Sequence, residues 1–333
     1  MEPALIIEWV IKSAILLLFG VTGFAYLTLY ERRALARIQV RIGPNRAGPF
    51  GILQPVADGI KLIFNQELIP ATADKVLFVL APIITVLPAL IIWAVIPWGR
   101  QVIIGGREIN LYLSNANVGV LYLTAVASIA VYGIVIAGWS SNNKYALLGG
   151  LRSSAQMVSY ELALGISFIG PIMLAGSMSL VDIVEAQSKV WYIVPQFLAF
   201  LIFMMAGLAE INRAPFDMPE AEQELTAGYH AEYSGMKFAL FFMAEYIKMI
   251  AIAAIGVTLF LGGYRIPFID IPPAIEPLVF FIKILILLFV IIWVRATFPR
   301  FRYDRLMAFG WKILLPLSLA NVFITAVILV FRG

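Results

Sequence analysis

The sequence predicts an all-α polytopic membrane protein with eight transmembrane helices and a short amphipathic helix at the membrane interface. Of its 333 residues, 62% are hydrophobic and only 13% are Asp, Glu, Lys or Arg, whereas soluble globular chains carry roughly 25% charged residues. So few polar residues could not cover the surface of a water-soluble fold. We therefore expect a single integral-membrane domain over 1–333, in which most apolar side chains face lipid or one another.

Eight apolar stretches are long enough to cross a hydrocarbon core as helix, which takes about 20 residues. They are continuous rather than alternating, which excludes a β-barrel with strands of about 10 residues. The first stretch carries Glu8 and Lys12 and has no small-residue cleavage site, so it is predicted to be a retained helix rather than a signal peptide. The predicted spans are about 5–29, 76–98, 117–138, 158–178, 190–210, 238–262, 277–297 and 311–331.

Basic residues predict the orientation, because loops rich in Lys and Arg stay in the cytoplasm. Together with the adjacent helix ends, the four loops on one side hold 16 of the 24 Lys and Arg residues. Both termini are thus predicted to lie on the opposite, periplasmic side of a bacterial cytoplasmic (inner) membrane. The predicted cytoplasmic loops are about 30–75, 139–157, 211–237 and 298–310.

The first cytoplasmic loop is about 45 residues long, and long loops are often functional. It opens with Tyr30-Glu31-Arg32-Arg33 and continues into the turn Ile42-Gly43-Pro44-Asn45-Arg46. Its arginines suit either lipid headgroups or an anionic partner. Later in the loop, apolar residues recur at helical spacing while Asp58, Lys61 and Asn65 share the opposite face. This pattern predicts an amphipathic helix lying in the membrane plane, which could frame an opening for a lipid-soluble substrate.

The third cytoplasmic loop is acidic, which the positive-inside rule does not predict. Between 211 and 236, Arg213 is the only Lys or Arg, and His230 is the only histidine of the chain. An acidic patch on the basic side indicates a protein interface or a path for cations, while a solvated helix end is the simpler alternative. A lone loop histidine more often forms a local hydrogen bond than catalyses a reaction. The acids are Asp217, Glu220, Glu222, Glu224 and Glu232.

Besides Glu8 in the first span, three carboxylates fall inside the predicted spans, all toward their cytoplasmic ends. Glu161 lies near the start of the fourth span, Glu210 at the end of the fifth and Glu245 about two turns into the sixth. A charge near the bilayer centre costs about 3 kcal/mol on insertion scales, so such residues usually face a bundle interior or a wet cavity. They are candidates for a proton relay, because burial and neighbouring charges change the proton affinity of a carboxylate. For Glu245 the alternative is a structural ion pair with Lys248.

The chain has no chemistry of its own that a motif identifies. It has no cysteine and one histidine, which excludes thiolate metal sites, iron–sulfur clusters and His-rich metal or haem sites. Nucleotide-binding glycine loops of the GxGxxG or Walker type and Ser-His-Asp spacing are also missing. Any electrons that this protein handles must therefore be carried by other proteins.

Motifs along nearly the whole chain resemble one family, that of the H subunit, or NADH dehydrogenase subunit 1, of respiratory complex I. In the N-terminal half the matching stretches are Tyr30-Glu31-Arg32-Arg33, Arg41-Ile42-Gly43-Pro44-Asn45-Arg46-Ala47-Gly48, Leu53-Gln54-Pro55-Val56-Ala57-Asp58-Gly59-Ile60-Lys61, Gly138-Trp139-Ser140-Ser141-Asn142-Asn143-Lys144-Tyr145 and Ser154-Ala155-Gln156-Met157-Val158-Ser159-Tyr160-Glu161. In the C-terminal half they are Arg213-Ala214-Pro215-Phe216-Asp217-Met218-Pro219-Glu220-Ala221-Glu222-Gln223-Glu224-Leu225, Glu232-Tyr233-Ser234-Gly235, Ala244-Glu245-Tyr246 and Arg295-Ala296-Thr297-Phe298-Pro299-Arg300-Phe301-Arg302-Tyr303-Asp304.

The resemblance implies a membrane subunit of a proton-pumping NADH:quinone oxidoreductase that forms the membrane part of the quinone chamber. Quinone is then the substrate, and no metal, flavin or iron–sulfur cluster is expected on this chain. The implied partners are the peripheral-arm iron–sulfur and quinone-site subunits at the cytoplasmic loops, other membrane-arm subunits including antiporter-like ones, and lipids, with no nucleic acid.

The resemblance also implies roles for individual residues. The quinone chamber and its entrance would be formed by Arg32, Arg33, Asp58, Lys61, Phe216, Asp217, Glu220, Glu222 and Glu224. The carboxylates that couple quinone reduction to proton movement would be Glu161, Glu210, Glu232 and Glu245.

One departure from the family pattern concerns the third span, which has no acid here, so that Ser128 is its nearest polar candidate. Two other functions are alternatives. A stand-alone secondary transporter would use Glu245, Lys248 and the proline-containing fourth span as an ion site. A membrane-bound hydrogenase-type assembly would share the architecture, but the complete quinone-loop motifs argue against it.

Overall fold

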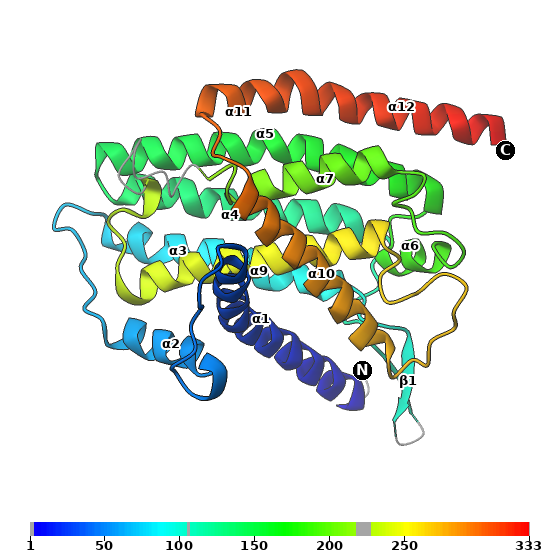
Figure 1. Ribbon diagram of the computed structural model, residues 1–333, viewed down its shortest axis with the longest axis horizontal. Helices are drawn as coiled ribbons and strands as arrows, with labels where there is room; N and C mark the ends of the chain where they lie inside the picture. The colour runs from blue at the N-terminus through cyan, green and yellow to red at the C-terminus, as the bar shows by residue number, and fades with distance from the viewer. Residues whose placement is uncertain (1–2, 105–106, 218–227, 333) are drawn as a thin grey trace.

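The structure is a computed structural model, and it describes residues 3–104, 107–217 and 228–332. Within these residues the fold is a bundle of long helices with a small β-hairpin at one end (Figure 1). The N-terminal third contains α1 (Pro3–Ile38), the turn η1 (Pro49–Gly51), α2 (Gln54–Phe64), α3 (Lys75–Ile91), the turn η2 (Ile92–Val95) and the antiparallel strands β1 (Gln101–Ile104) and β2 (Arg107–Asn110).

The elements named in the remainder of the described chain are helices. It contains α4 (Gly119–Ser140), α5 (Lys144–Ala175), α6 (Leu180–Ala186), α7 (Phe197–Glu210), the turn η3 (Gly228–His230), α9 (Gly235–Phe260), α10 (Glu276–Thr297), α11 (Tyr303–Phe309), the π-helical turn η4 (Gly310–Leu314) and α12 (Leu315–Arg332).

Seven helical segments in the described residues are long and apolar enough to cross a membrane, which confirms a helical polytopic membrane protein. The fifth predicted span corresponds to α7, which is apolar but spans only Phe197–Glu210. At 1.5 Å per residue its length is about 21 Å, less than a hydrocarbon core of about 30 Å. The eighth span therefore stays a prediction. The all-α expectation also missed the hairpin of β1 and β2.

Helix α5 begins well before the predicted fourth span. The side chain of Asn143 caps it by accepting a hydrogen bond from the backbone N–H of Tyr145 at 2.9 Å. The helix then continues without interruption to Ala175, so most of the predicted loop 139–157 is helical. Its length, about 48 Å, exceeds the thickness of a hydrocarbon core of about 30 Å, and Glu161 lies near the middle of the helix.

Helix α9 is the centre of the bundle, and α1 is at its edge. In their apolar segments 61% of α9 but only 11% of α1 is buried. Helix α9 packs against α3, α1, α10 and α7, while α12 packs along α5 (Figure 1). Close approach to α7 requires Gly256, because a Cβ atom there would lie 2.6 Å from the Phe203 ring. Most residues of α9 from Tyr246 to Phe260 are consequently buried.

The C-terminal end of α9 is held by α10. The Lys283 ammonium donates hydrogen bonds to the carbonyl oxygens of Leu261, Gly263 and Arg265 at 2.7, 2.8 and 2.5 Å. These carbonyls would otherwise lack helical partners. This contact fixes α9 at the end of the bundle opposite the predicted cytoplasmic loops.

Candidate functional site

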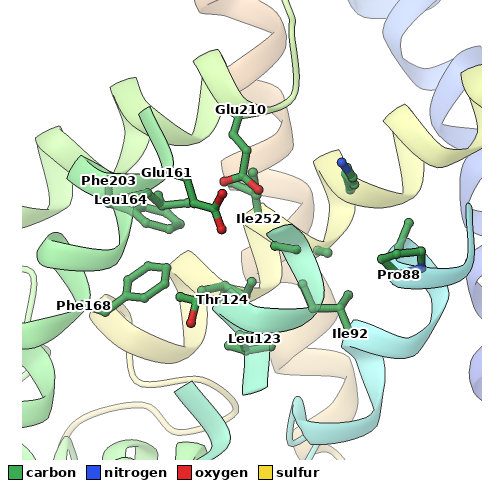
Figure 2. Close-up of a pocket in the computed structure, with 15 residues that line it drawn as sticks. Pro88, Ile92, Leu123, Thr124, Glu161, Leu164, Phe168, Phe203, Glu210 and Ile252 are labelled. Atoms are coloured by element: carbon green, nitrogen blue, oxygen red, sulfur yellow. The ribbon is translucent and has the colours of Figure 1, made fainter. Parts of the chain in front are cut away.

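Four polar side chains from four helices meet inside the bundle, at a cavity of about 30 Å³. Figure 2 shows the carboxylates of Glu161 on α5 and Glu210 on α7 pointing into the same space. Lys248 of α9 also lines this cavity, and the Ser128 hydroxyl of α4 donates a hydrogen bond to Glu161. An ordered water needs about 10–15 Å³ on this measure, so the cavity can hold water between these groups.

Glu210 is the most enclosed of these acids. Its side chain is buried, and its Oε2 atom has no hydrogen-bond partner among the described residues. Electrostatically it interacts with Lys248 and with Glu161. A buried carboxylate oxygen without a partner is costly, and internal water or a bound proton satisfies it. Glu210 is therefore a buried acid with one carboxylate oxygen that the described residues leave without a hydrogen bond.

A second cavity, of about 40 Å³, continues from the first toward the third cytoplasmic loop. Glu210 and Lys248 line both cavities, so the two spaces meet at this pair. The second cavity also contacts Glu245 of α9, Asp217 of the loop and His230 of η3. Ionisable side chains thus follow one another from the loop to Glu161 in the middle of the bundle.

Beyond the second cavity lies a buried ion cluster, which we define as Glu31, Arg213, Glu245 and Arg295. Arg213 pairs with Glu31 through Nη1 at 3.2 Å and with Glu245 through Nε. Arg295 of α10 pairs with the same Glu31 oxygen. The side chains of Glu31 and Arg213 are each only 3% exposed. The cluster joins α1, α9 and α10 to the start of the third loop.

The Arg213 guanidinium is the hub of this cluster. It lies over the Tyr246 ring, 4.2 Å from the centroid, which adds a cation–π contact to its ion pairs. Burial alone would lower the pKa of Arg213, but the Glu245 and Glu31 carboxylates raise it above its usual value. Arg213 therefore remains a fixed positive charge. Glu245 pairs with this arginine from the loop, whereas sequence spacing suggested a pair with Lys248 on the same helix.

The loop residues Phe216 and Asp217 are tied to the segment that follows α10. The Asp217 carboxylate, 1% exposed, accepts a hydrogen bond from Arg300 at 3.2 Å. Phe216 stacks on Phe301 with ring centroids 5.7 Å apart. Asp217 contacts the second cavity, but Phe216 is packed in the hydrophobic core.

Glu232 stands apart from the two cavities. It is half-buried and accepts a hydrogen bond from Asn143 at the start of α5, at 2.7 Å. Glu232 lines neither cavity. The nearby Tyr233 ring stacks on Phe78, and burial raises the pKa of Tyr233 to about 12, so the phenol stays protonated at neutral pH. The predicted acids Glu220, Glu222 and Glu224 lie outside the described residues.

The predicted quinone entrance gathers around α2. Arg32 of α1 donates a hydrogen bond to Asp58 at 2.8 Å, and Gln54 donates to the other Asp58 oxygen at 2.9 Å. Lys61 is exposed one turn further along α2. Arg33 faces a different space, between α1, the loop that follows it and α10. The structure therefore groups Arg32, Asp58 and Lys61 and separates Arg33 from them.

Sequence reasoning missed Glu31, Arg213 and Arg295 as site residues. Arg213 could have been noticed in the sequence, since it is the only Lys or Arg between 211 and 236. Its partner Glu31 lies 182 residues away in the chain, so no local pattern could have paired them. Residue spacing could not have predicted the contact between Ser128 and Glu161 either.

These features define a class: a polytopic helical membrane protein with a row of ionisable groups inside its helix bundle. Comparison with known proteins then gives the family. The NADH dehydrogenase family profile matches residues 11–326, and the chain belongs to this family.

Three relatives illustrate the similarity, and each is named as an H subunit of NADH-quinone oxidoreductase. The relative from Geobacter sulfurreducens, the second of that name in its organism, is 52% identical over 321 residues, which covers 96% of each chain. The relatives from Protochlamydia amoebophila and Rhodospirillum rubrum are also each 52% identical. The match to the first of these covers 92% of both chains, and the match to the second covers 98% of this chain and 95% of the relative.

Proposed function

We propose that this chain is the membrane subunit of a proton-pumping NADH:quinone oxidoreductase. It forms the membrane side of the quinone chamber and couples quinone reduction to proton translocation through its buried carboxylates. The observation that carries this proposal is the pair of cavities that meet at Glu210 and Lys248 and connect the loop at Asp217 with Glu161 inside the bundle.

The electrons come from partner proteins of the complex, since the chain has no cysteine and one histidine. Quinone reduction takes up two electrons and two protons, so the region around the headgroup gains negative charge until protons arrive. A new negative charge favours proton uptake by neighbouring carboxylates. Asp217 and Glu245 are the described acids nearest the loop that respond first, and Glu210 and Glu161 follow along the cavities.

The ion cluster sets the direction of this response. Arg213 and Arg295 hold Glu31 ionised, so Glu31 is a fixed anchor and not a carrier. Glu245 shares Arg213 with Glu31 and also lines the second cavity, so it can gain a proton at the cost of one ion pair. Movement of the third loop, which carries Arg213, would then change the proton affinity of Glu245. The loop thus transmits the state of the quinone chamber to the bundle.

The quinone enters, in this proposal, beside α2. Helix α2 has no buried residue, which supports the proposal that it lies at the interface in the membrane plane. Arg32, Asp58 and Lys61 line the rim, and the acids Glu220, Glu222 and Glu224 belong to the chamber. We further propose that α7 completes an eighth span, with both termini periplasmic and the basic loops cytoplasmic.

Partners follow from this arrangement. The peripheral-arm iron–sulfur and quinone-site subunits dock on the cytoplasmic loops, and antiporter-like subunits and others of the membrane arm pack against outer helices. The relatives match nearly the whole chain, which favours such a subunit over the stand-alone transporter and the hydrogenase-type alternative.

The test replaces Glu161 by Gln, which keeps its shape and removes its charge. In membranes with the assembled complex, we expect NADH-driven quinone reduction to fall at least about tenfold, as expected when a proton-transfer group is lost. NADH oxidation by a water-soluble acceptor that bypasses quinone should stay unchanged. Glu108→Gln, on the exposed β2 strand, is the matched control. Normal quinone reduction and proton pumping by assembled Glu161→Gln would refute the role of this residue.

A further inference from the structure

Two adjacent arginines at the cytoplasmic end of α1 serve different spaces. Arg32 is bound to Asp58 of α2. Arg33 instead lines a pocket of about 640 Å³ between α1, the turn at 42–45 and Phe289 of α10. The pocket lined by Arg33 is not part of the quinone entrance proposed above.

This pocket is basic, and its charges are unpaired. Arg33 and Arg37 lie one turn apart on α1, and Arg41 follows just beyond the helix end. Arg41 donates a hydrogen bond to Gln39 at 2.7 Å. Within the described part of the chain, no carboxylate pairs with any of the three arginines, and no acid lines the pocket. Three guanidinium groups in this setting match a phosphate, which they bind with paired N–H···O bonds.

An apolar groove of about 430 Å³ continues from the basic pocket along α1 and α10. Tyr30 and Arg33 line both spaces, so the groove opens directly into the pocket. Its walls are aliphatic and aromatic, including Phe19 and Gly23 of α1 and Leu285 of α10. The rise along α1 from Phe19 to Arg33 is about 21 Å, and one leaflet of hydrocarbon is about 15 Å thick. The groove is therefore long enough for an acyl chain.

We propose that this composite site binds an anionic phospholipid of the cytoplasmic leaflet. Its phosphate lies among Arg33, Arg37 and Arg41, and one acyl chain occupies the groove between α1 and α10. Both spaces fall in the range of about 300–1,000 Å³ that is usual for ligand pockets. A quinone fits less well, because its neutral headgroup does not compensate three unpaired cations. The lipid fastens the poorly buried α1 to α10, beside the ion cluster that Arg295 and Glu31 form.

The experiment uses the intact detergent-purified complex and native mass spectrometry. The complex is stripped of loose lipid and titrated with dioleoylphosphatidylglycerol or dioleoylphosphatidylcholine. In the wild type we expect one tightly held phosphatidylglycerol that phosphatidylcholine and inorganic phosphate do not displace. Each basic residue near an anionic lipid is worth roughly fivefold in affinity, so Arg33→Gln/Arg37→Gln/Arg41→Gln should weaken this binding on the order of 100-fold.

Matched controls separate the site from general charge. Arg46→Gln/Lys144→Gln/Arg305→Gln removes three exposed charges on the same predicted side of the membrane and should leave binding unchanged. Leu285→Trp fills the groove while keeping every arginine and should also weaken binding. If the triple variant fails to assemble, Arg37→Gln alone should lose roughly fivefold.

Three results would overturn the proposal. One is equal retention of the two lipids by the wild type, and another is equal loss of phosphatidylglycerol in the control. The third is unchanged phosphatidylglycerol binding by the triple variant and by Leu285→Trp, which would place the bound lipid elsewhere. None of these results bears on Glu161 or Glu210, so the proposed coupling function is tested separately.

Discussion

The interior around α9 and the edge around α1 both concentrate charge, but they do so in opposite ways. Inside, Arg213 and Arg295 are paired with Glu31, and Lys248 lies among carboxylates at the joint of two cavities. At the edge, Arg33 and Arg37 face a pocket without an acid. We propose that the opposite charges enclosed by protein form a proton path, and that the unpaired charges at the edge bind an anion from outside the chain. The arginines of the interior and those of the edge differ in what surrounds them and not in residue type.

Breaking the interior cluster should give the largest effect on stability. Arg213→Leu removes the cation that the buried Glu31 shares with Glu245, and the loss of one partner from a buried pair costs about 3–5 kcal/mol. We expect a clearly lower melting temperature of the purified complex, or loss of assembly. The control is Arg302→Leu, which breaks an exposed pair with Asp304 worth about 0–1 kcal/mol. Equal melting temperatures for the two variants would show that the cluster does not hold the loop.

Breaking the ion pair at the proposed quinone entrance should have a smaller effect on stability and a specific effect on the KM for quinone. The pair of Arg32 and Asp58 is partly exposed, so Asp58→Leu should cost no more than about 1 kcal/mol of stability. The KM for a short-chain quinone should rise up to about tenfold, the worth of one charge-assisted hydrogen bond of roughly 1.5 kcal/mol. Steady-state kinetics measure this KM, with Arg46→Leu as the control. An unchanged KM for Asp58→Leu would show that α2 does not form the quinone entrance.

Much of the site could be predicted because a charge in an apolar segment is conspicuous. Glu161, Glu210 and Glu245 stood out for this reason, and the structure brings all three to the two cavities. Glu232, which resemblance grouped with them, is bound to Asn143 outside the cavities. The position of Glu232 depends on how η3 packs against the start of α5. The periodicity of the sequence does not predict that contact.

The fold shows the same division between local and distant information. Long apolar runs predicted the helices that cross the bundle, since hydrophobicity over about 20 residues is a local property. They did not predict that α5 starts at Lys144, because Gly149, Gly150 and the serines of that stretch are polar or small yet compatible with a packed helix. The ion cluster depends on contacts between four distant segments, which only the folded chain reveals.

In the proposed coupling mechanism, protons move through the cavities joined at Glu210. The most direct measurement is the number of protons translocated per NADH oxidised by the complex in sealed proteoliposomes, for the wild type and for Glu210→Gln. We predict that the assembled variant translocates fewer protons and reduces quinone more slowly, while electron transfer to an acceptor that bypasses quinone is unchanged. A Glu210→Gln complex with the wild-type proton-to-electron ratio and the wild-type rate of quinone reduction would contradict it.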